Sequence, residues 1–182
     1  SNAIHSTQSR FGESVAALGE VNVTVTTDRK KTKVSATVED NGHGLTPENW
    51  EAFTTTDTDN KMTIGGKGVG RLLWLDCFQN TRVSSVFLDN GTLHRRTFRF
   101  VLDNDDQIQE EVLETVEDGG SSSFHVHFEG LRDNTYFEKF PGRGSFVFQH
   151  LTSHFLPVFI GGRSPKITVQ IGDETEHYPG AI

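Results

Sequence analysis

Hydrophobic and polar residues alternate along several short stretches of the chain, which is the pattern of strands that bury one face. Near the N-terminus, residues 21–26 (VNVTVT) and 33–39 (KVSATVE) alternate in this way on either side of a charged turn. Five later stretches carry the same signal, and Asn90-Gly91 after the first of them predicts a tight hairpin turn. These stretches are residues 82–88, 93–102, 107–116, 123–128 and 166–171.

Other segments predict helices. Thr46 is a candidate N-cap before Pro47, and residues 69–78 (VGRLLWLDCF) form a short, strongly apolar stretch. Residues 145–160 are amphipathic at helical spacing, with Pro157 predicting a kink or an earlier end. The order of elements does not alternate strictly between strand and helix. It predicts an α+β two-layer sandwich, with a mixed, mostly antiparallel sheet and helices on one face.

Composition narrows the class of protein. A chain of 182 residues with 34% hydrophobic and 23% charged residues suits a single soluble domain over residues 1–182. The net charge of −8 argues against direct nucleic-acid binding, because an acidic surface repels phosphate backbones. No apolar run approaches the roughly 20 residues that span a bilayer, so no membrane contact and a cytoplasmic location are predicted. The single cysteine, Cys77, is predicted to be a small buried hydrophobic residue.

The first loop with candidate chemistry is Asp40-Asn41-Gly42-His43-Gly44, which follows a predicted strand directly. A carboxylate fixed at a strand end can accept a hydrogen bond from the exocyclic amine of adenine, whereas guanine presents an acceptor there. Asp40 would therefore favour adenine. Gly42 and Gly44 would let the backbone approach a flat base closely. A plain Asp-Asn-Gly turn is the alternative interpretation.

The second loop, GGKGVG at residues 65–70, precedes the predicted apolar helix. Four glycines within six residues suit a backbone that wraps around a ligand, and a helix N-terminus behind them attracts anions. The spacing fits neither the P-loop nor the dinucleotide-binding fingerprint, and a flexible hinge is the alternative. The candidate phosphate-binding residues are Lys61, Gly66, Lys67, Gly68, Val69 and Gly70.

Together, the two loops resemble the G1 and G2 boxes of the GHKL superfamily, whose ATP-binding domain is also called the Bergerat fold. Members include gyrase B, the ninety-kilodalton heat-shock chaperones, histidine kinases and MutL. The resemblance implies that Asp40 binds adenine, that residues 65–70 meet the phosphates, and that residues 46–64 form an ATP lid. It also implies a hydroxyl near adenine, a role for Ser122 or Ser123 in the run GSSSF. The run GGKGVGRLLWL is most similar to the chaperone-type or uncharacterised prokaryotic branch.

The start of the chain extends this resemblance. The family carries an N box on its first helix, where a Glu activates water and an Asn four residues later binds Mg²⁺. Residues 2–4 (NAI) are similar to part of that box, which implies that Asn2 is a metal ligand, although residues 1–3 (SNA) also match a tag remnant. No Glu stands four residues before Asn2, and aligning Glu13 instead would put Ala17 in the Asn position. ATP hydrolysis is therefore expected only in a longer native chain.

Several other residues are of types that occur in binding sites. His43 lies within the first loop and is a candidate for the edge of a nucleotide pocket. His125 and His127 share one face of a predicted strand, but no third metal ligand stands at a convincing spacing, so they are predicted to be surface residues. Trp50 and Trp74 are expected in the core.

The favoured hypothesis is an ATP-binding domain of a larger GHKL-type protein, with ATP or ADP and Mg²⁺ as ligands. The resemblance further implies a downstream domain or protein partner and an ATP-dependent homodimer. Two alternatives stay open. One is a non-catalytic nucleotide-sensing or protein-interaction module, and the other is a glycine-looped, β-rich binding protein unrelated to nucleotides.

Overall fold

A computed structural model describes residues 2–27, 33–55, 69–103, 106–117, 120–133 and 144–180. The described strands are β1 (Glu20–Thr27), β2 (Val34–Asp40), β3 (Phe78–Asp89), β4 (Thr92–Phe100), β5 (Ile108–Thr115), β6 (Ser123–Leu131), β7 (Lys166–Ile171) and β8 (Glu174–Tyr178). The described helices are α1 (Asn2–Phe11), the 3₁₀ turn η1 (Gly12–Ser14), α2 (Val15–Leu18), α3 (Pro47–Thr54), α4 (Val69–Cys77) and α6 (Gly144–Ile160).

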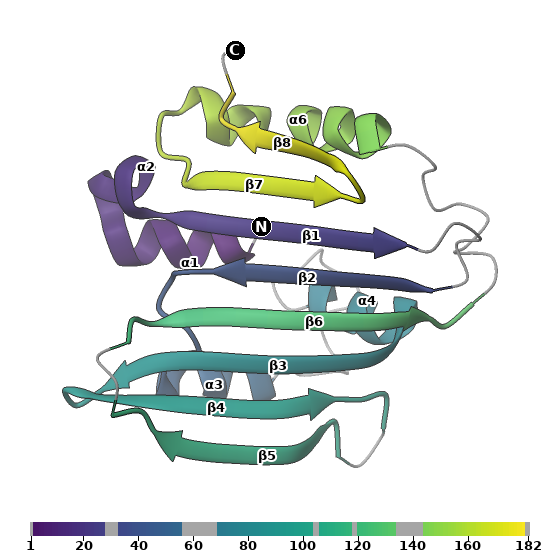
Figure 1. Cartoon of the computed structure of the whole chain (residues 1–182). Coiled ribbons are helices and arrows are strands. Elements are labelled where there is room, and N and C mark those ends of the chain that lie inside the picture. The colour runs from purple at the N-terminus through teal and green to yellow at the C-terminus, as the bar shows by residue number, and fades with distance from the viewer. Residues whose placement is uncertain are drawn as a thin grey trace.

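The eight strands form one sheet in the order β5-β4-β3-β6-β2-β1-β7-β8. All neighbouring pairs are antiparallel except β1 and β7, which run parallel. Helices α1, α3 and α4 lie behind the sheet in the view of Figure 1, and α6 lies beside β7 and β8. The predicted α+β class, with a mixed and mostly antiparallel sheet covered by helices on one face, is confirmed.

Strand alternation separates an apolar, helix-covered face from a polar one, which we call the open face. On β6, Val126 and Phe128 are buried under the helices, whereas His125 and His127 lie on the open face and are half-buried. The first segments predicted as strands alternate for the same reason, since the valines of β1 and β2 lie on the helix-covered face, where Val21 and Val34 are buried.

A first hydrophobic cluster lies between the middle of the sheet and helices α3 and α4. Leu75 of α4 packs with Phe98 and Phe128 of the sheet, and Trp50 and Trp74 pack against this cluster. Both tryptophans therefore belong to the core, as predicted. Thr46 caps α3 through a hydrogen bond from the Asn49 N–H to its hydroxyl oxygen, 3.3 Å long, with Pro47 in the first turn.

A second cluster lies under α1 and α6, where Ile4 and Phe159 pack with Val169 of β7. The predicted position of α6 is confirmed, but an end before Pro157 is wrong, because the helix continues through Pro157 to Ile160. Proline removes one backbone hydrogen bond from a helix interior. Packing of the apolar stripe against the sheet outweighs that loss.

Other local expectations had mixed outcomes. Asn90 and Gly91, with φ of 48° and 82°, form the predicted hairpin turn between β3 and β4. Cys77 is half-buried at the end of α4 rather than buried. Strand β8 was not predicted, because only Tyr178 among its five residues is buried and no alternation marks it.

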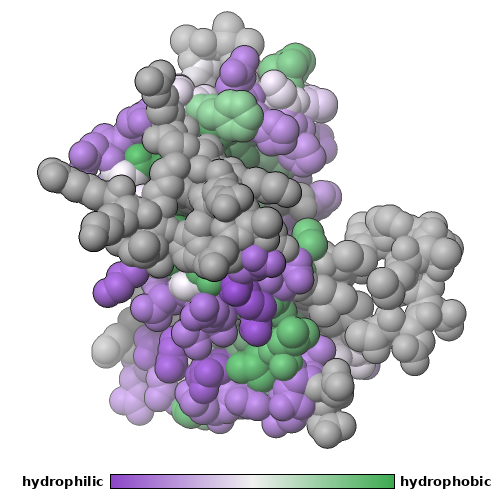
Figure 2. Space-filling view, turned by 90° about the vertical axis from the view of Figure 1, so that its right-hand side faces the viewer, coloured by the Kyte–Doolittle hydropathy of each residue, from purple (hydrophilic) through white to green (hydrophobic). Residues whose placement is uncertain are grey.

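Hydrophilic residues cover much of the described surface seen from the right-hand side of Figure 1, with hydrophobic residues gathered in small areas (Figure 2). Among the described helices, none combines the length and the apolarity that a bilayer span requires.

Candidate functional site

The candidate site is centred on Asp40, the last residue of β2, on the helix-covered side of the sheet. Its carboxyl is buried, with 6% of the residue exposed. Oδ1 accepts a hydrogen bond from the Gly42 N–H, 2.9 Å long, and the Ser6 hydroxyl of α1 also hydrogen-bonds to the carboxyl. Burial raises the pKa of Asp40 from 3.8 to about 6, and these two hydrogen bonds oppose the rise. Asp40 is therefore a hydrogen-bond acceptor in a fixed position, and burial destabilises its ionised form because the carboxylate loses solvation.

The backbone after Asp40 is held by side chains from three other elements. The His43 N–H donates to Ser6 Oγ of α1 over 3.1 Å, and the Leu45 N–H donates to Ser85 Oγ of β3 over 2.7 Å. The carbonyl oxygen of Gly44 accepts from Asn49 Nδ2 of α3 over 2.8 Å. These bonds fix the loop before any ligand arrives, so ordering it on binding would cost little entropy.

The structure shows why glycine is needed at positions 42 and 44, which the sequence alone did not reveal. A Cβ on Gly42 would overlap Ser6 Oγ and lie 2.7 Å from the backbone carbonyl carbon of Ser6. Gly44 has φ of +70°, and a Cβ there would overlap the carbonyl oxygen of Val86 and lie 2.7 Å from Ser85 Oγ. Both glycines are therefore required for close packing of the loop against α1 and β3, whatever contact they make with a base.

Arg10, two turns along α1 from the chain start, joins two segments that are remote in sequence. Its Nη1 donates to the carbonyl oxygens of Asn41 at 2.6 Å, Gly42 at 3.2 Å and Ser122 at 2.8 Å. Its Nη2 donates to the Ser121 hydroxyl oxygen at 2.8 Å. One guanidinium thus ties the loop after β2 to the segment that leads into β6.

The pairing of β2 with β6 distinguishes between Ser122 and Ser123 as the candidate hydroxyl near Asp40. Phe124 lies directly opposite Asp40 in the antiparallel register and shares its face. Since side chains alternate along a strand, Ser123 points to the open face, away from Asp40, and Ser122 directly precedes β6. Ser122 is buried, with 8% exposed, whereas Ser123 is half-buried. The geometry therefore favours Ser122 as the hydroxyl beside Asp40.

Helix α1 presents Asn2, Ser6 and Arg10 at intervals of four residues, which places them along one stripe of the helix. Ser6 and Arg10 both contact the loop after β2, and Asn2 is exposed in the first turn. Ser6 and Arg10 were missed in the sequence, as were Ser85 and Asn49. The four-residue spacing from Asn2 onwards marks one stripe of a helix, but it does not say which segments that stripe contacts.

Much of the second loop falls outside the described residues. Among the predicted phosphate-binding residues, Val69 and Gly70 form the first turn of α4. Of the lid predicted over residues 46–64, the described part is α3 with its flanking residues 46 and 55. The remaining predicted residues that lie outside the described part of the chain are Lys61, Gly66, Lys67 and Gly68.

The other polar candidates lie at different places. His43 is half-buried within the loop after Asp40. His125 and His127 face the open side of the sheet, where His125 Nδ1 lies 3.0 Å from Glu39 Oε1. Across the described ranges, no three His, Cys, Asp or Glu residues are grouped so that they could hold a metal ion.

No protein-family model matches the sequence, and no curated protein matches it either. Solved ATPase domains are similar to it at low identity. The MutL ATPase domain of Aquifex aeolicus complexed with ADP is 14% identical over 90% of this chain and 57% of that chain, with a TM-score of 0.48. The 43K ATPase domain of Thermus thermophilus gyrase B, in complex with an aminocoumarin, is 22% identical over 86% and 39%, with a TM-score of 0.47. The ATPase region of Saccharomyces cerevisiae topoisomerase II is 15% identical over 94% and 46%, with a TM-score of 0.45.

These similarities are weak. The identities lie below 25% and the TM-scores below 0.5, so they carry no residue's role to this chain and do not distinguish between branches of the GHKL superfamily. The chain spans 39% to 57% of the length of these three chains. The chaperone-type or prokaryotic branch stays a prediction.

Proposed function

We propose that this chain is the ATP-binding domain of a larger GHKL-type protein, and that it recognises adenine through the carboxylate of Asp40. The observation that carries the proposal is the buried, fixed position of this carboxyl at the end of β2. A buried carboxylate held by only a few donors gains from one more N–H group, because that group replaces lost solvation. The exocyclic amine at C6 of adenine offers such a donor, whereas guanine carries an acceptor oxygen at the same position.

Ser122 and Arg10 support the same assignment. Ser122 is buried two residues before Phe124, the residue opposite Asp40, and the GHKL resemblance expects a hydroxyl here that helps to hold a water between the carboxylate and the base. Arg10 binds carbonyl oxygens on both sides of this place and would keep Asp40 and Ser122 at a fixed spacing. A rigid pair of polar groups is what recognition of one flat base requires.

The phosphates would lie at the start of α4. Its N-terminus begins at Val69 and carries the partial positive charge of a nine-residue helix. Asn2 would hold Mg²⁺, which would neutralise charge on the phosphates when bound. Gly70 of α4 and four residues that precede the helix complete the proposed set, namely Lys61, Gly66, Lys67 and Gly68.

Closure of residues 46–64 over the nucleotide would then signal to further domains or to a protein partner, with ATP-dependent dimerisation as one form of that signal. ATP hydrolysis is not assigned to any described residue. The ligands of the proposed domain are ATP or ADP with Mg²⁺.

The test compares ATP affinity in the wild-type chain, Asp40→Asn and Asp173→Asn, by calorimetry with Mg²⁺ present. Asp173 lies in the exposed turn between β7 and β8, so its variant makes the same change of charge away from the site. Loss of a charge-assisted hydrogen bond should weaken ATP binding roughly 10- to 100-fold in Asp40→Asn, and Asp173→Asn should match the wild type. Equal ATP affinity in all three proteins would remove Asp40 from the adenine site.

A second comparison tests the base rather than the phosphates. The wild-type chain should bind ATP more tightly than GTP, because GTP presents an acceptor to Asp40. The preference should disappear in Asp40→Asn, whose amide can donate as well as accept. A wild-type chain that binds ATP and GTP equally would contradict adenine recognition even if nucleotide binding itself stands.

A further inference from the structure

Ser6 of α1 lies at the contact between this helix and the loop after β2. Its Oγ accepts a hydrogen bond from the His43 N–H, 3.1 Å long, and its hydroxyl also hydrogen-bonds to the carboxyl of Asp40. Glycine is required at position 42 beside it, because a Cβ there would overlap Ser6 Oγ. The hydroxyl is therefore placed by the backbone of the helix on one side and by the backbone of the loop on the other.

A hydroxyl has a single proton, so the partners of Ser6 decide where that proton points. The His43 N–H can only donate, and it occupies one lone pair of Oγ. The ionised carboxylate of Asp40 can only accept, so the Ser6 proton is donated to it. The three groups form a chain in which each donor points towards the carboxylate. Because hydrogen bonds in a chain polarise one another, the bond from His43 makes the Ser6 hydroxyl a stronger donor.

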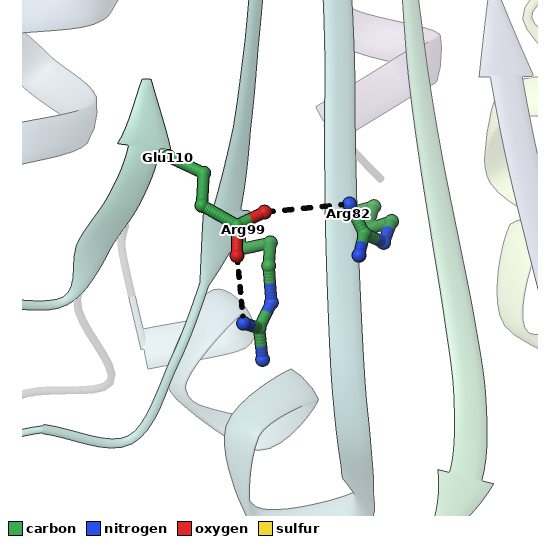
Figure 3. A network of polar contacts seen from close by, with 3 residues as sticks. All are labelled: Arg82, Arg99 and Glu110. Atoms are coloured by element: carbon green, nitrogen blue, oxygen red, sulfur yellow. Dashed lines mark hydrogen bonds and ion pairs between the residues drawn. The ribbon is translucent and has the colours of Figure 1, made fainter.

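Other carboxylates of the chain are paired with arginine. Glu110 of β5 lies between two guanidinium groups, with Oε1 3.0 Å from Arg99 Nη1 and Oε2 3.6 Å from Arg82 Nη1 (Figure 3). Asp40 is held differently, because no ion pair between the described residues includes it. Arg10, the cation of α1 beside this loop, directs its donors at carbonyl and hydroxyl oxygens instead. The ionised form of Asp40 therefore depends on neutral donors.

The Gly42 N–H and the Ser6 hydroxyl are the neutral donors that reach the Asp40 carboxyl from the described residues. Burial raises the pKa of Asp40 to about 6, and these two donors oppose the rise. The directly opposite residues on the neighbouring strands, Val21 and Phe124, are apolar, so their side chains supply neither a donor nor a charge. With so few donors, loss of one would move the titration of Asp40 towards neutral pH.

From the bridging position of its hydroxyl and the small number of donors around the carboxyl, we infer that Ser6 is a positioning residue for the adenine base. It holds the carboxylate of Asp40 in the fixed, ionised form that accepts a hydrogen bond from the exocyclic amine. The inference rests on the proposed recognition of adenine by Asp40. Ser6 acts through Asp40 and the backbone of His43, and it sets the pH range in which the site can bind the base.

The first measurement follows Asp40 itself in the ligand-free chain. The signal of its carboxyl carbon is titrated by ¹³C NMR in the wild type, Ser6→Ala and Ser85→Ala. This carbon is chosen because His43 lies in the same loop and imidazoles titrate in this pH range. Ser6→Ala should raise the midpoint by about one pH unit, because the ionised carboxylate loses a hydrogen bond.

Ser85→Ala is the matched control. Ser85 Oγ anchors the same loop by accepting from the Leu45 N–H over 2.7 Å, and it donates to the Ser123 carbonyl oxygen over 3.2 Å. Its variant removes a loop anchor without removing a donor from Asp40, so the midpoint should stay within about 0.3 pH units of the wild type. An unshifted midpoint in Ser6→Ala, or equal shifts in both variants, would overturn the inference.

Ser6→Thr separates the lost donor from altered packing. It keeps a hydroxyl at the same position, so it should reverse most of the shift seen in Ser6→Ala. A midpoint in Ser6→Thr equal to that in Ser6→Ala would mean that changed packing moves the titration, and would contradict the role of the hydroxyl.

The second measurement is adenosine affinity by calorimetry, in the wild type and Ser6→Ala, between about pH 5.5 and about pH 8.5. A midpoint raised by about one unit should weaken binding about fivefold near pH 6 and less than about twofold near pH 8.5, where both carboxyls are ionised. A pH-dependent wild type with the same profile in Ser6→Ala would overturn the inference alone. A wild-type chain that binds no adenosine at any of these pH values would overturn the proposed recognition of adenine, and the inference with it.

Discussion

Arg10 Nη1 lies 2.8 Å from the carbonyl oxygen of Ser122, a residue 112 positions later in the chain. The same guanidinium also binds the carbonyl oxygens of Asn41 and Gly42. The end of β2 and the start of β6 are therefore held together by a side chain of α1 as well as by the sheet. The candidate site depends on this bond because Asp40 and Ser122 belong to the two segments that it joins.

Arg10→Gln should destabilise the fold by about 2–4 kcal/mol, because three carbonyl oxygens lose a charged donor. Denaturant unfolding would measure the change. Arg163→Gln, at an exposed arginine beyond α6, should change stability by less than about 0.5 kcal/mol. Arg10→Lys should recover only part of the loss, since a lysine lacks the planar fork. An Arg10→Gln protein as stable as the wild type would contradict the role of this bond.

Nucleotide affinity should depend on pH through Asp40. Its pKa is raised by burial to about 6, and an adenine amine binds the ionised carboxylate. Protonation therefore competes with the base, and affinity should fall by about tenfold between about pH 7.5 and about pH 5. Adenosine is the suitable ligand, because it has no phosphate that titrates in this range. A flat affinity across this range in calorimetry would rule out the ionised carboxylate as the acceptor.

Asp40→Asn should be at least as stable as the wild type at neutral pH in the absence of ligand. A folded-state pKa raised from 3.8 to about 6 means that ionised Asp40 destabilises the fold, by up to about 3 kcal/mol. The stability that goes with the protonated Asp40 carboxyl is fully present below about pH 3.8, and it is lost as the pH rises through about 6. The variant should therefore gain about 1–3 kcal/mol over the wild type at about pH 7.5, and the gain should shrink towards about pH 4.

Denaturant unfolding of both proteins across this range would measure that difference. A variant less stable than the wild type at neutral pH would show that Asp40 supports the fold more through its hydrogen bonds to Gly42 and Ser6 than it costs in solvation. If Asp40→Asn loses ATP binding and gains stability, the carboxylate of Asp40 contributes to ligand binding and not to the stability of the fold.

Gly42→Ala should destabilise the fold by about 2–3 kcal/mol, because the added Cβ would overlap Ser6 Oγ. The double variant Gly42→Ala/Ser6→Gly should recover part of this loss, and the remaining overlap with the backbone of residue 6 should prevent full recovery. Gly161→Ala, whose Cβ would lie 3.2 Å from the Pro157 carbonyl oxygen at the end of α6, should cost less than about 1 kcal/mol. Thermal unfolding of the four proteins checks the series, and a double variant no more stable than Gly42→Ala would contradict the contact.

Much of the fold could be predicted because its strands bury one face each. The alternation in residues 21–26 and 123–128 reports contact with the helix layer, and that contact recurs at every second residue. Strand β8 carries no such signal. It lies at the edge of the sheet, and only its pairing with β7 defines it.

The candidate site was predicted less completely, for a physical reason. Asp40 could be found because it follows a clear strand and precedes two glycines. Ser6 and Arg10 could not, because their partners lie in other segments of the chain, and a single sequence does not state which segments meet. Likewise, Ser122 and Ser123 could be separated only once the register of β2 and β6 was known.

The parallel pairing of β1 with β7 has a consequence for how the chain is made. β1 pairs over residues 20–25 with residues 166–171, so one edge of β1 has no partner until the ribosome has released residues 166–171. Contacts between such distant segments form slowly, and an exposed strand edge in the meantime invites pairing with other chains. Chains shortened before residue 166 should therefore aggregate during expression, even though Asp40, Arg10 and Ser122 all lie upstream of that point.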